Sequence, residues 1–187
     1  MKQENPRIRF TKVREVVSPC RNNSTDAGID FYVPTDLTEN DFLSIEANRL
    51  SGIDPDFNFK LGPTGHVEII YVRPGQRILI PSGIKVLIEP EYSMLQANNK
   101  SGISSKQGLI FSAEVVDSPY VGEVHIGVIN TSGDMAQIIQ AGKKLMQFIH
   151  VPVFLTVPEE ISNVEYHSLA EDWGTRGTNG FGSSDNQ

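Results

Sequence analysis

Apolar and polar residues alternate in short runs along most of this chain, and glycine, proline, asparagine and aspartate separate the runs. Such alternation is typical of strands that bury one face. The runs predicted to be strands are 8–10, 67–72, 78–80, 84–88, 109–111, 124–129 and 145–149. Glycine and proline predict turns at 73–76 and 81–83. No long amphipathic helix is expected, and a short helix is favoured at 101–107.

These elements predict an all-β domain, built as a barrel or as a double-sheet roll. Residues 35–66 do not follow the pattern, because Asp, Glu, Asn, Pro and Gly dominate there with scattered Phe and Leu. We interpret this stretch as an insertion or a long excursion on the surface. The predicted organisation is a single domain over 1–174 that contains the excursion, followed by a C-terminal arm over 175–187.

Composition limits the classes of molecule that this chain is expected to bind. A chain of 187 residues suits one domain, and its net charge of -7 argues against stable nucleic-acid binding, which needs a basic face. A few local cations could still hold an anionic small molecule. Cys20 is the one cysteine, so an intramolecular disulfide is excluded, and we assign it no catalytic role. With no apolar run near 18 residues and no signal-peptide pattern, we expect a cytoplasmic protein with no membrane contact.

The glycine-rich stretch 176–184 carries two side chains suited to binding. Arg176 offers a guanidinium fork for phosphate, and Phe181 offers a ring for stacking. The glycines between them let the backbone approach an anion closely. We interpret the arm as a flexible lid that closes over a phosphorylated ligand with a flat base. A disordered tail is the alternative that this stretch, taken alone, leaves open.

Two motifs combine small residues with a charged side chain. In 26–31, small residues precede Asp30, which indicates close backbone packing with the carboxylate aimed into a site. The second motif places Lys100, Ser101 and Gly102 at the predicted helix start, where free backbone N–H groups attract anions. A turn leading into a strand would also explain the first motif, and Ser101 as an N-cap would explain the second.

Two further motifs lie later in the chain. In 115–124 an apolar strand ends in Asp117, a Ser-Pro turn follows and a second strand begins at Val121. This predicts a β-hairpin with Asp117 and Tyr120 at its tip, although plain turn chemistry explains the same residues. In 142–149 a glycine turn leads into a strand that bears Gln147.

Taken in order, these motifs read A-G-x-D, S-G, D-x-x-Y-x-G, G-x-x-x-x-Q and R-G-x-x-G-F-G-S. The series resembles the trimeric dUTP diphosphatase (dUTPase) family over roughly 8–184, omitting the excursion, and the third and fifth motifs are the specific ones. The resemblance implies hydrolysis of dUTP to dUMP and pyrophosphate. It also implies a jelly-roll-like β-clip barrel that assembles as a homotrimer, with three active sites at subunit interfaces and Mg²⁺ bound by the triphosphate.

The resemblance assigns the reacting end of the substrate to the third motif. Asp117 matches the aspartate that positions and activates the attacking water and contacts the sugar 3′-hydroxyl. Tyr120 matches the tyrosine that packs under deoxyribose and leaves no room for a 2′-hydroxyl. The backbone of 108–117 matches the segment that reads uracil through main-chain hydrogen bonds.

The other motifs match residues around the phosphates and the base. Lys100, Ser101 and Gly102 match the motif that holds the phosphates and the leaving group, and Gln147 matches a glutamine near the phosphates. The arm's Arg176 and Phe181 match an arginine on the γ-phosphate and a phenylalanine stacked over uracil. Asp30 matches an aspartate that supports the site and its metal-bound waters, so no direct protein ligand to the metal is expected.

The chain departs from the family pattern at several positions. Lys100 stands where arginine is usual, and a lysine keeps the charge but loses the bidentate fork. Glu114 and Asn179 stand where glycine is common, and the run 108–117 is shorter than usual. These differences concern the phosphate grip, the uracil pocket and the backbone of the arm.

Three rival functions remain to be weighed. A dCTP deaminase shares the fold and needs a glutamate a few residues into the strand after the hairpin, where this chain has Gly127. A regulatory module would bind a protein partner through 35–66. A structural jelly-roll protein without catalysis would leave the ordered motifs unexplained.

Overall fold

The structure, a computed structural model, describes residues 6–172. They fall into two compact units, the first ending at Phe154 and the second beginning at Leu155. The strands are β1 (Arg7–Lys12), β2 (Ile29–Tyr32), β3 (Phe59–Leu61), β4 (Val67–Val72), β5 (Arg77–Glu89), β6 (Ser93–Asn98), β7 (Leu109–Phe111), β8 (Val115–Asp117), β9 (Glu123–Asn130), β10 (Gln137–Gln140) and β11 (Lys144–Pro152). The helices are α1 (Glu39–Leu43), α2 (Glu46–Leu50), α3 (Pro55–Asn58), α4 (Ser101–Gln107) and α5 (Asn163–Glu171).

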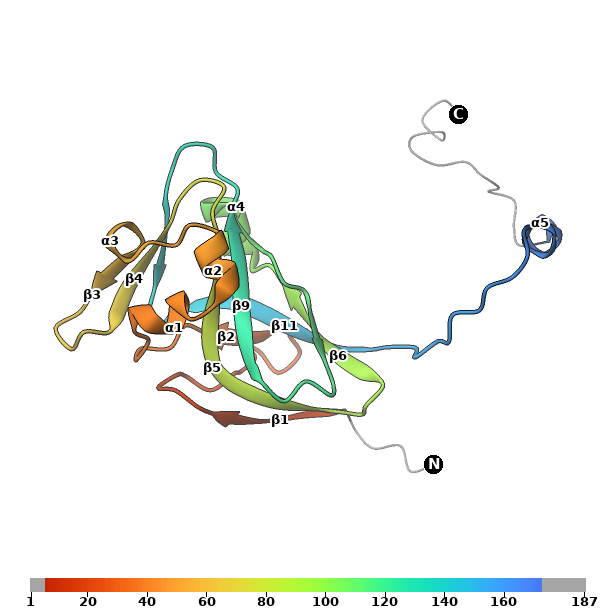
Figure 1. Ribbon diagram of the computed structural model, residues 1–187. Coiled ribbons are helices and arrows are strands. Elements are labelled where there is room, and N and C mark those ends of the chain that lie inside the picture. Colours follow the sequence, from red (N-terminus) through yellow and green to blue (C-terminus); the bar gives the residue numbers. More distant parts are fainter. Residues whose placement is uncertain (1–5, 173–187) are drawn as a thin grey trace. The chain divides into compact units, whose positions relative to one another are not determined.

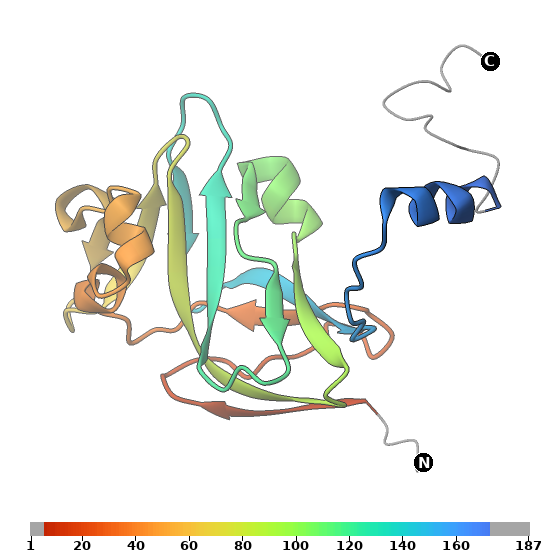
Figure 2. The ribbon, with the colours of Figure 1, turned by 45° about the vertical axis from the view of Figure 1, so that its right-hand side comes forward.

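Antiparallel strands build the first unit, as the alternation predicts (Figure 1). One four-stranded sheet has the order β1-β5-β9-β7 and the other has the order β2-β11-β6-β8. A smaller sheet has the order β10-β4-β3. Figure 2 shows how β5 and β9 of the first large sheet cross in front of β11 of the second. The described strands thus form open sheets arranged as a roll, which confirms the all-β prediction.

The core lies between the sheets and comes from the inward positions of each strand. In β5 the buried apolar residues are Ile78, Ile80, Ile84, Val86 and Ile88. Across the core, Phe31 of β2 packs against Phe148 of β11 with the ring centroids 4.6 Å apart. Because successive side chains of a strand point to opposite faces, this spacing places one face of β5 in the core.

The turn predicted at 81–83 is wrong, because β5 runs without interruption through these residues. Its pairing with β9 instead shifts between Pro81 and Lys85. Gly83 has φ +73°, a backbone conformation that favours glycine, and its carbonyl accepts a hydrogen bond from Val13 N at 2.8 Å. Proline and glycine here mark an irregularity inside one long strand rather than its end.

The hairpin predicted over 115–124 is also wrong. β8 pairs with β6, whereas β9 pairs with β5 and β7, so the two strands around Asp117 and Tyr120 belong to different sheets. The turn between them carries the chain from one large sheet to the other. Asp117 therefore lies at the end of an edge strand, and the turn is free to shape a site.

Residues 35–66 are more ordered than the sequence indicates, since they fold into α1, α2, α3 and β3. The apolar residues Leu37, Phe42 and Ile53 are buried in the core of the first unit. The side chain of Asn48 is also buried and makes three hydrogen bonds, to Phe42 O and to both backbone groups of Leu79. The stretch is thus a packed cover over β5 rather than a loose loop.

The second unit contains α5, a helix that the sequence pattern does not predict. Ser162 caps this helix by accepting a hydrogen bond from Glu165 N at 3.2 Å. Its apolar side chains are not gathered on one face of the helix, so the sequence lacks the apolar stripe that would predict it, and Val164, Tyr166 and Leu169 are exposed. Within residues 6–172, no helix is long and apolar enough to cross a membrane.

Candidate functional site

Strand pairing brings three of the predicted motifs to one place. In the sheet formed by β2, β11 and β6, Gln147 of β11 lies opposite Asp30 on one side and opposite Asn98 on the other. Lys100 follows two residues after Asn98, as the N-cap of α4. Residues far apart in the sequence, from the first, second and fourth motifs, thus become neighbours through antiparallel register.

A buried carboxylate joins two lysines at this place. Asp30 is 4% exposed, with one oxygen bound by Lys100 Nζ and the other 2.8 Å from Lys144 Nζ. Burial by itself raises the pKa of Asp30, but the hydrogen bonds and positive charges of both lysines outweigh it and hold the pKa below its ordinary value. The cluster carries a net positive charge, which suits an anion. Lys144 was not predicted, although its signal was present in the paired lysines after Gly142.

Gln147 is held in place by its surroundings. Its side-chain amide donates to Asn99 O at 2.8 Å. Gly28 lies directly against it, because a Cβ at position 28 would come within 2.8 Å of Gln147 Cδ. This close contact agrees with the packing that the small residues of 26–31 predict.

A hollow of about 260 Å³ opens beside this cluster and is lined by Lys100, Ser101, Gly102, Ile103 and Gln147. We call it the lysine hollow. The helix predicted at 101–107 is confirmed as α4, but its N-cap is Lys100 and not Ser101. The capping role considered for Ser101 is therefore wrong, and its exposed side chain is available to a ligand.

A second hollow, of about 260 Å³, surrounds the third motif. We call it the tyrosine hollow, and it is lined by Leu79, Ala113, Val115, Val116, Asp117, Tyr120, Val124, His125 and Phe148. Tyr120 N donates to Asp117 O at 3.0 Å and closes the turn. The Tyr120 hydroxyl donates to Glu123 O at 2.9 Å, which folds the ring back over Gly122. A Cβ on Gly122 would lie 2.9 Å from Tyr120 Cε2, so a larger residue there would have to displace the ring.

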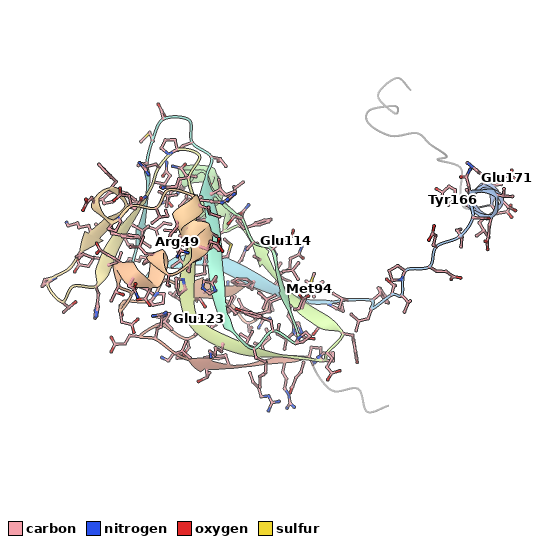
Figure 3. The ribbon with its side chains drawn as sticks, viewed as in Figure 1. Arg49, Met94, Glu114, Glu123, Tyr166 and Glu171 are labelled. Atoms are coloured by element: carbon pink, nitrogen blue, oxygen red, sulfur yellow. The ribbon has the colours of Figure 1, made fainter. Side chains whose placement is uncertain are left out.

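The neighbours of Glu114 bear on the predicted uracil pocket, and those of Gly127 bear on the deaminase alternative. The Glu114 carboxylate accepts a hydrogen bond from Gln96 Nε2 at 2.6 Å and does not line the tyrosine hollow; Figure 3 shows it along the β6 side of the sheet. A Cβ on Gly127 would lie 2.6 Å from Ser112 Oγ and 2.8 Å from Leu79 Cδ2. No larger side chain fits at position 127 without displacing these neighbours.

The two hollows are separate within one copy of the chain and share no lining residue. The distance between the hollows can be followed along β6, where Met94 lies opposite Asp117 and Asn98 lies opposite Gln147. Four residues of strand correspond to roughly 13 Å. The predicted site residues that lie within 6–172 therefore fall into two groups, and one copy of the chain does not bring these groups together.

Arg176, Phe181 and Asn179 lie outside the described residues. Within 6–172, no group of three or more His, Cys, Asp or Glu side chains could hold a metal ion. Both oxygens of Asp30 are engaged by lysines. The residues present thus fit a magnesium ion that arrives with an anionic substrate better than one held by protein carboxylates.

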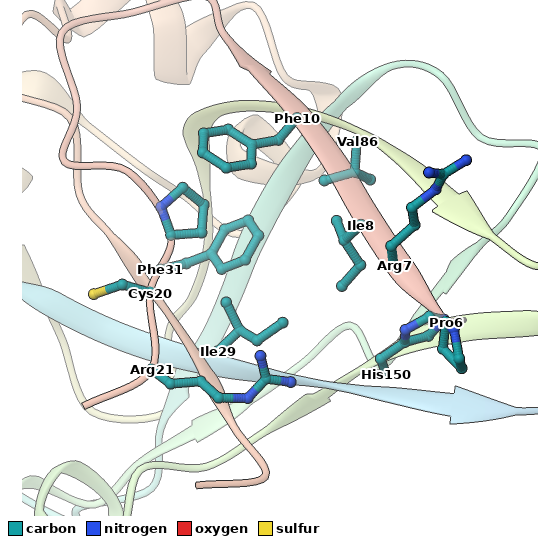
Figure 4. Close-up of a pocket in the computed structure, with 11 residues that line it drawn as sticks. Pro6, Arg7, Ile8, Phe10, Cys20, Arg21, Ile29, Phe31, Val86 and His150 are labelled. Carbon is teal, nitrogen blue, oxygen red and sulfur yellow. The ribbon is translucent and has the colours of Figure 1, made fainter. Parts of the chain in front are cut away.

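A third hollow, of about 210 Å³, contains none of the predicted site residues (Figure 4). Its apolar lining comes from Ile8 and Phe10 of β1, and from Ile29 and Phe31 of β2. His150 closes one end, and burial lowers its pKa, with the charge of Arg21 acting in the same direction. It is a gap between β1 and the neighbouring sheet, without an arrangement of groups for the predicted chemistry.

The chain is similar to proteins of one family. The family model described as dUTPase matches residues 67–185. The deoxyuridine 5'-triphosphate nucleotidohydrolase of Chlamydia pneumoniae is 39% identical over 117 residues, which cover 62% of this chain and 75% of that protein.

Solved structures of dUTPases share the fold. A mutant dUTPase of Staphylococcus bacteriophage 80alpha with dUpNHpp superposes with a TM-score of 0.66 at 18% identity, covering 95% of this chain and 98% of that one. A mutant dUTPase from phage phi11 of S. aureus, described with a structural Mg(II) ion, gives a TM-score of 0.59 at 19% identity, covering 84% of this chain and 97% of that one.

Proposed function

The chain belongs to the dUTPase family, and from that premise we propose how its residues hydrolyse dUTP to dUMP and pyrophosphate. The observation that carries the proposal is the lysine hollow. There, three motifs far apart in the sequence converge on a positively charged site that suits a triphosphate. The reaction limits uracil in DNA and supplies dUMP for dTMP synthesis, and we propose that it takes place in the cytoplasm.

Asp117 is the catalytic residue of this proposal. Its exposed carboxylate is free to orient a water molecule and accept its proton as the water attacks the α-phosphate. No covalent nucleophile is required, and the exposed Cys20 takes no part. Tyr120, 45% exposed and folded back over Gly122, would pack under deoxyribose and exclude a 2′-hydroxyl. The backbone of 108–117 would read uracil.

Cationic and polar groups would hold the triphosphate. Lys100 supplies charge, and Ser101, Gly102 and Gln147 supply hydrogen bonds at the edge of the same hollow. Arg176 would bind the γ-phosphate and Phe181 would stack over uracil, so the arm closes the site and excludes water. Asp30 acts through Lys100 by fixing its ammonium group.

Magnesium would enter with the substrate, held by the phosphates and by water near Asp30. When bound, it neutralises charge on the triphosphate and so eases attack by water. Asp30 itself remains with its two lysines, which already occupy both of its oxygens.

We propose a homotrimer in which each active site combines residues of different copies. One copy alone keeps Asp117 and Tyr120 roughly 13 Å along β6 from the position of Gln147, and the groups line separate hollows. A second copy that sets its tyrosine hollow against the lysine hollow would complete the site. The arm over 175–187 would close it, following the domain over 1–174.

The rival deaminase reaction lacks its general acid/base. Gly127 stands where that glutamate is needed, and its surroundings leave no room for a longer side chain. Glu123, the nearest carboxylate along β9, is bound by Arg14 and by Gly83 N. Neither residue is therefore available to shuttle protons.

The proposed function is tested by pyrophosphate release from dUTP, dCTP, dTTP and UTP in the presence of magnesium, with ammonia release from dCTP measured in parallel. We expect turnover of dUTP and near silence on UTP. Comparable rates on all four nucleotides would contradict the roles of Tyr120 and of the uracil-reading backbone. Ammonia release would favour the deaminase, and no turnover at all would favour a structural protein.

A further inference from the structure

A partly buried ion network links the 35–66 segment to the turn that carries Tyr120. Arg14, in the stretch after β1, places Nη1 2.9 Å from Asp41 Oδ1 on α1. Its Nε lies 2.9 Å and its Nη2 3.4 Å from the two carboxylate oxygens of Glu123. Only 22% of the Arg14 and Asp41 side chains and 16% of the Glu123 side chain are exposed.

The backbone around Arg14 is fixed on both sides. Val13 N donates to Gly83 O, and Glu15 N donates to Asp36 Oδ2, which ties this stretch to β5 and to the start of the segment. The guanidinium therefore has little freedom to follow a moving partner. Its planar fork meets Glu123 through two nitrogens, a geometry that a lysine cannot reproduce.

Glu123 connects the fixed guanidinium of Arg14 to Tyr120. Its Oε1 also accepts a hydrogen bond from Gly83 N at 2.7 Å, so its side chain is held from two elements. Its main-chain carbonyl accepts the hydrogen bond of the Tyr120 hydroxyl at 2.9 Å. Figure 3 shows Glu123 at the start of β9, where the turn enters the sheet. The ring of Tyr120 can keep its place over Gly122 only while this carbonyl keeps its own.

We propose that Arg14 is a positioning residue for sugar selection, through which the 35–66 segment holds Tyr120 in the conformation that excludes a 2′-hydroxyl. The inference rests on the proposed function, since it takes Tyr120 to pack under deoxyribose. It gives the 35–66 segment a role in the reaction that its distance from the motifs in sequence does not indicate. Arg14, Asp41 and Glu123 touch no substrate and act through the turn.

A network that only stabilises the fold would lower thermal stability when broken and leave sugar selection unchanged. The experiment must therefore measure sugar selection and stability separately. Removing one partner of a buried ion pair destabilises a protein in either case. Selection between dUTP and UTP changes only if the position of Tyr120 changes. The decisive quantity is therefore the ratio of kcat/KM for dUTP to kcat/KM for UTP, with thermal stability measured on the same samples.

The variants are Arg14→Gln, Arg14→Lys and Asp41→Asn in the full chain, with Arg9→Gln as the matched control. Arg9 pairs with Glu89 on an exposed strand edge outside the network. Asp41→Asn is the milder change, because an amide oxygen can still accept the hydrogen bonds from Thr38 that cap α1. If Arg14→Gln does not fold, Asp41→Asn alone tests the proposal.

We expect Arg14→Gln and Asp41→Asn to reduce the dUTP-to-UTP ratio by on the order of tenfold, a modest part of the hundredfold that a 1 Å misplacement can cost. Arg14→Lys should recover part of the ratio, and Arg9→Gln should leave it unchanged. An unchanged ratio in both variants, with lowered thermal stability, would overturn the proposal. A wild-type chain that does not hydrolyse dUTP would instead overturn the proposed function. The inference would then be judged by the relative binding of dUMP and UMP to the same variants.

Discussion

At the scale of single residues, the site depends on how one buried carboxylate is paired. Asp30 bridges Lys100 and Lys144, and these contacts hold its pKa below the ordinary value of 3.8. The folded chain therefore binds a proton at Asp30 less readily than the unfolded chain does. This pairing contributes stability that is complete above about pH 5 and is lost as the pH falls through the folded-state pKa.

Asp30→Asn should make this contribution visible. The variant lacks the charge that both lysines need, so it should melt below the wild type at pH 7. As the pH falls from about 5 to 2, wild-type Asp30 becomes protonated and the difference in melting temperature should shrink. Differential scanning fluorimetry across this range measures it. A difference that stays constant with pH would show that the ion pairs do not stabilise the fold.

Gly28→Ala should weaken substrate binding while leaving the chain folded. The new Cβ would come within 2.8 Å of Gln147 Cδ, so the amide must turn away and lose its hydrogen bond to Asn99 O. We expect KM for dUTP to rise roughly tenfold, because the displaced amide can no longer donate a hydrogen bond to a charged phosphate oxygen of the substrate. Gly133→Ala is the control, because nothing lies within 4 Å of a Cβ there. Equal KM values in the two variants would contradict the role of Gln147.

At the scale of elements, the 35–66 segment is fastened by buried polar side chains. Asn48 bonds to Phe42 and Leu79, while Asn58 bonds to Tyr71 O and to the side chain of Gln76. Buried amides of this kind are costly unless every group is paired, and here they fix α2 onto β5 and α3 onto β4. Any protein partner bound through this segment would meet a rigid surface.

Asn48→Ala should loosen this cover. It removes a buried side chain and leaves both backbone groups of Leu79 without their partner, at a cost of about 2–4 kcal/mol. Urea denaturation measures the loss, and the exposed Asn40→Ala, on the neighbouring α1, should change stability by less than about 0.5 kcal/mol. A similarly small effect for Asn48→Ala would mean that the segment is held by its apolar contacts alone.

Several elements could be predicted from the sequence because their signal is local. Alternation located β1, β4, β7, β9 and β11, and the composition around Ser101 located α4. Sheet membership could not be predicted in this way, since β8 and β9 follow one another in sequence yet pair with different strands. Pro81 and Gly83 were read as a turn because an irregularity inside a strand uses the same residues. The helices of 35–66 escaped notice because each is too short to show a periodic apolar face.

At the scale of the whole molecule, the candidate site is distributed. Sequence order identified Asp30, Asp117 and Gln147, but only strand register shows that Asp30 and Gln147 adjoin while Asp117 lies apart. Partners such as Lys144 and Arg14 act through charges that meet only in the fold. An assembly in which one copy supplies the tyrosine hollow and another the lysine hollow accounts for both groups.

Subunit complementation tests this arrangement most directly. Asp117→Asn and Lys100→Met chains should each lose nearly all dUTP hydrolysis, about 10²–10⁴-fold for the aspartate. If the two are unfolded together and refolded in equal amounts, about a quarter of the sites in a randomly assorted trimer should join an intact Asp117 to an intact Lys100. Pyrophosphate release should then recover to about a quarter of the wild-type rate. A mixture no more active than its parents would contradict the composite site.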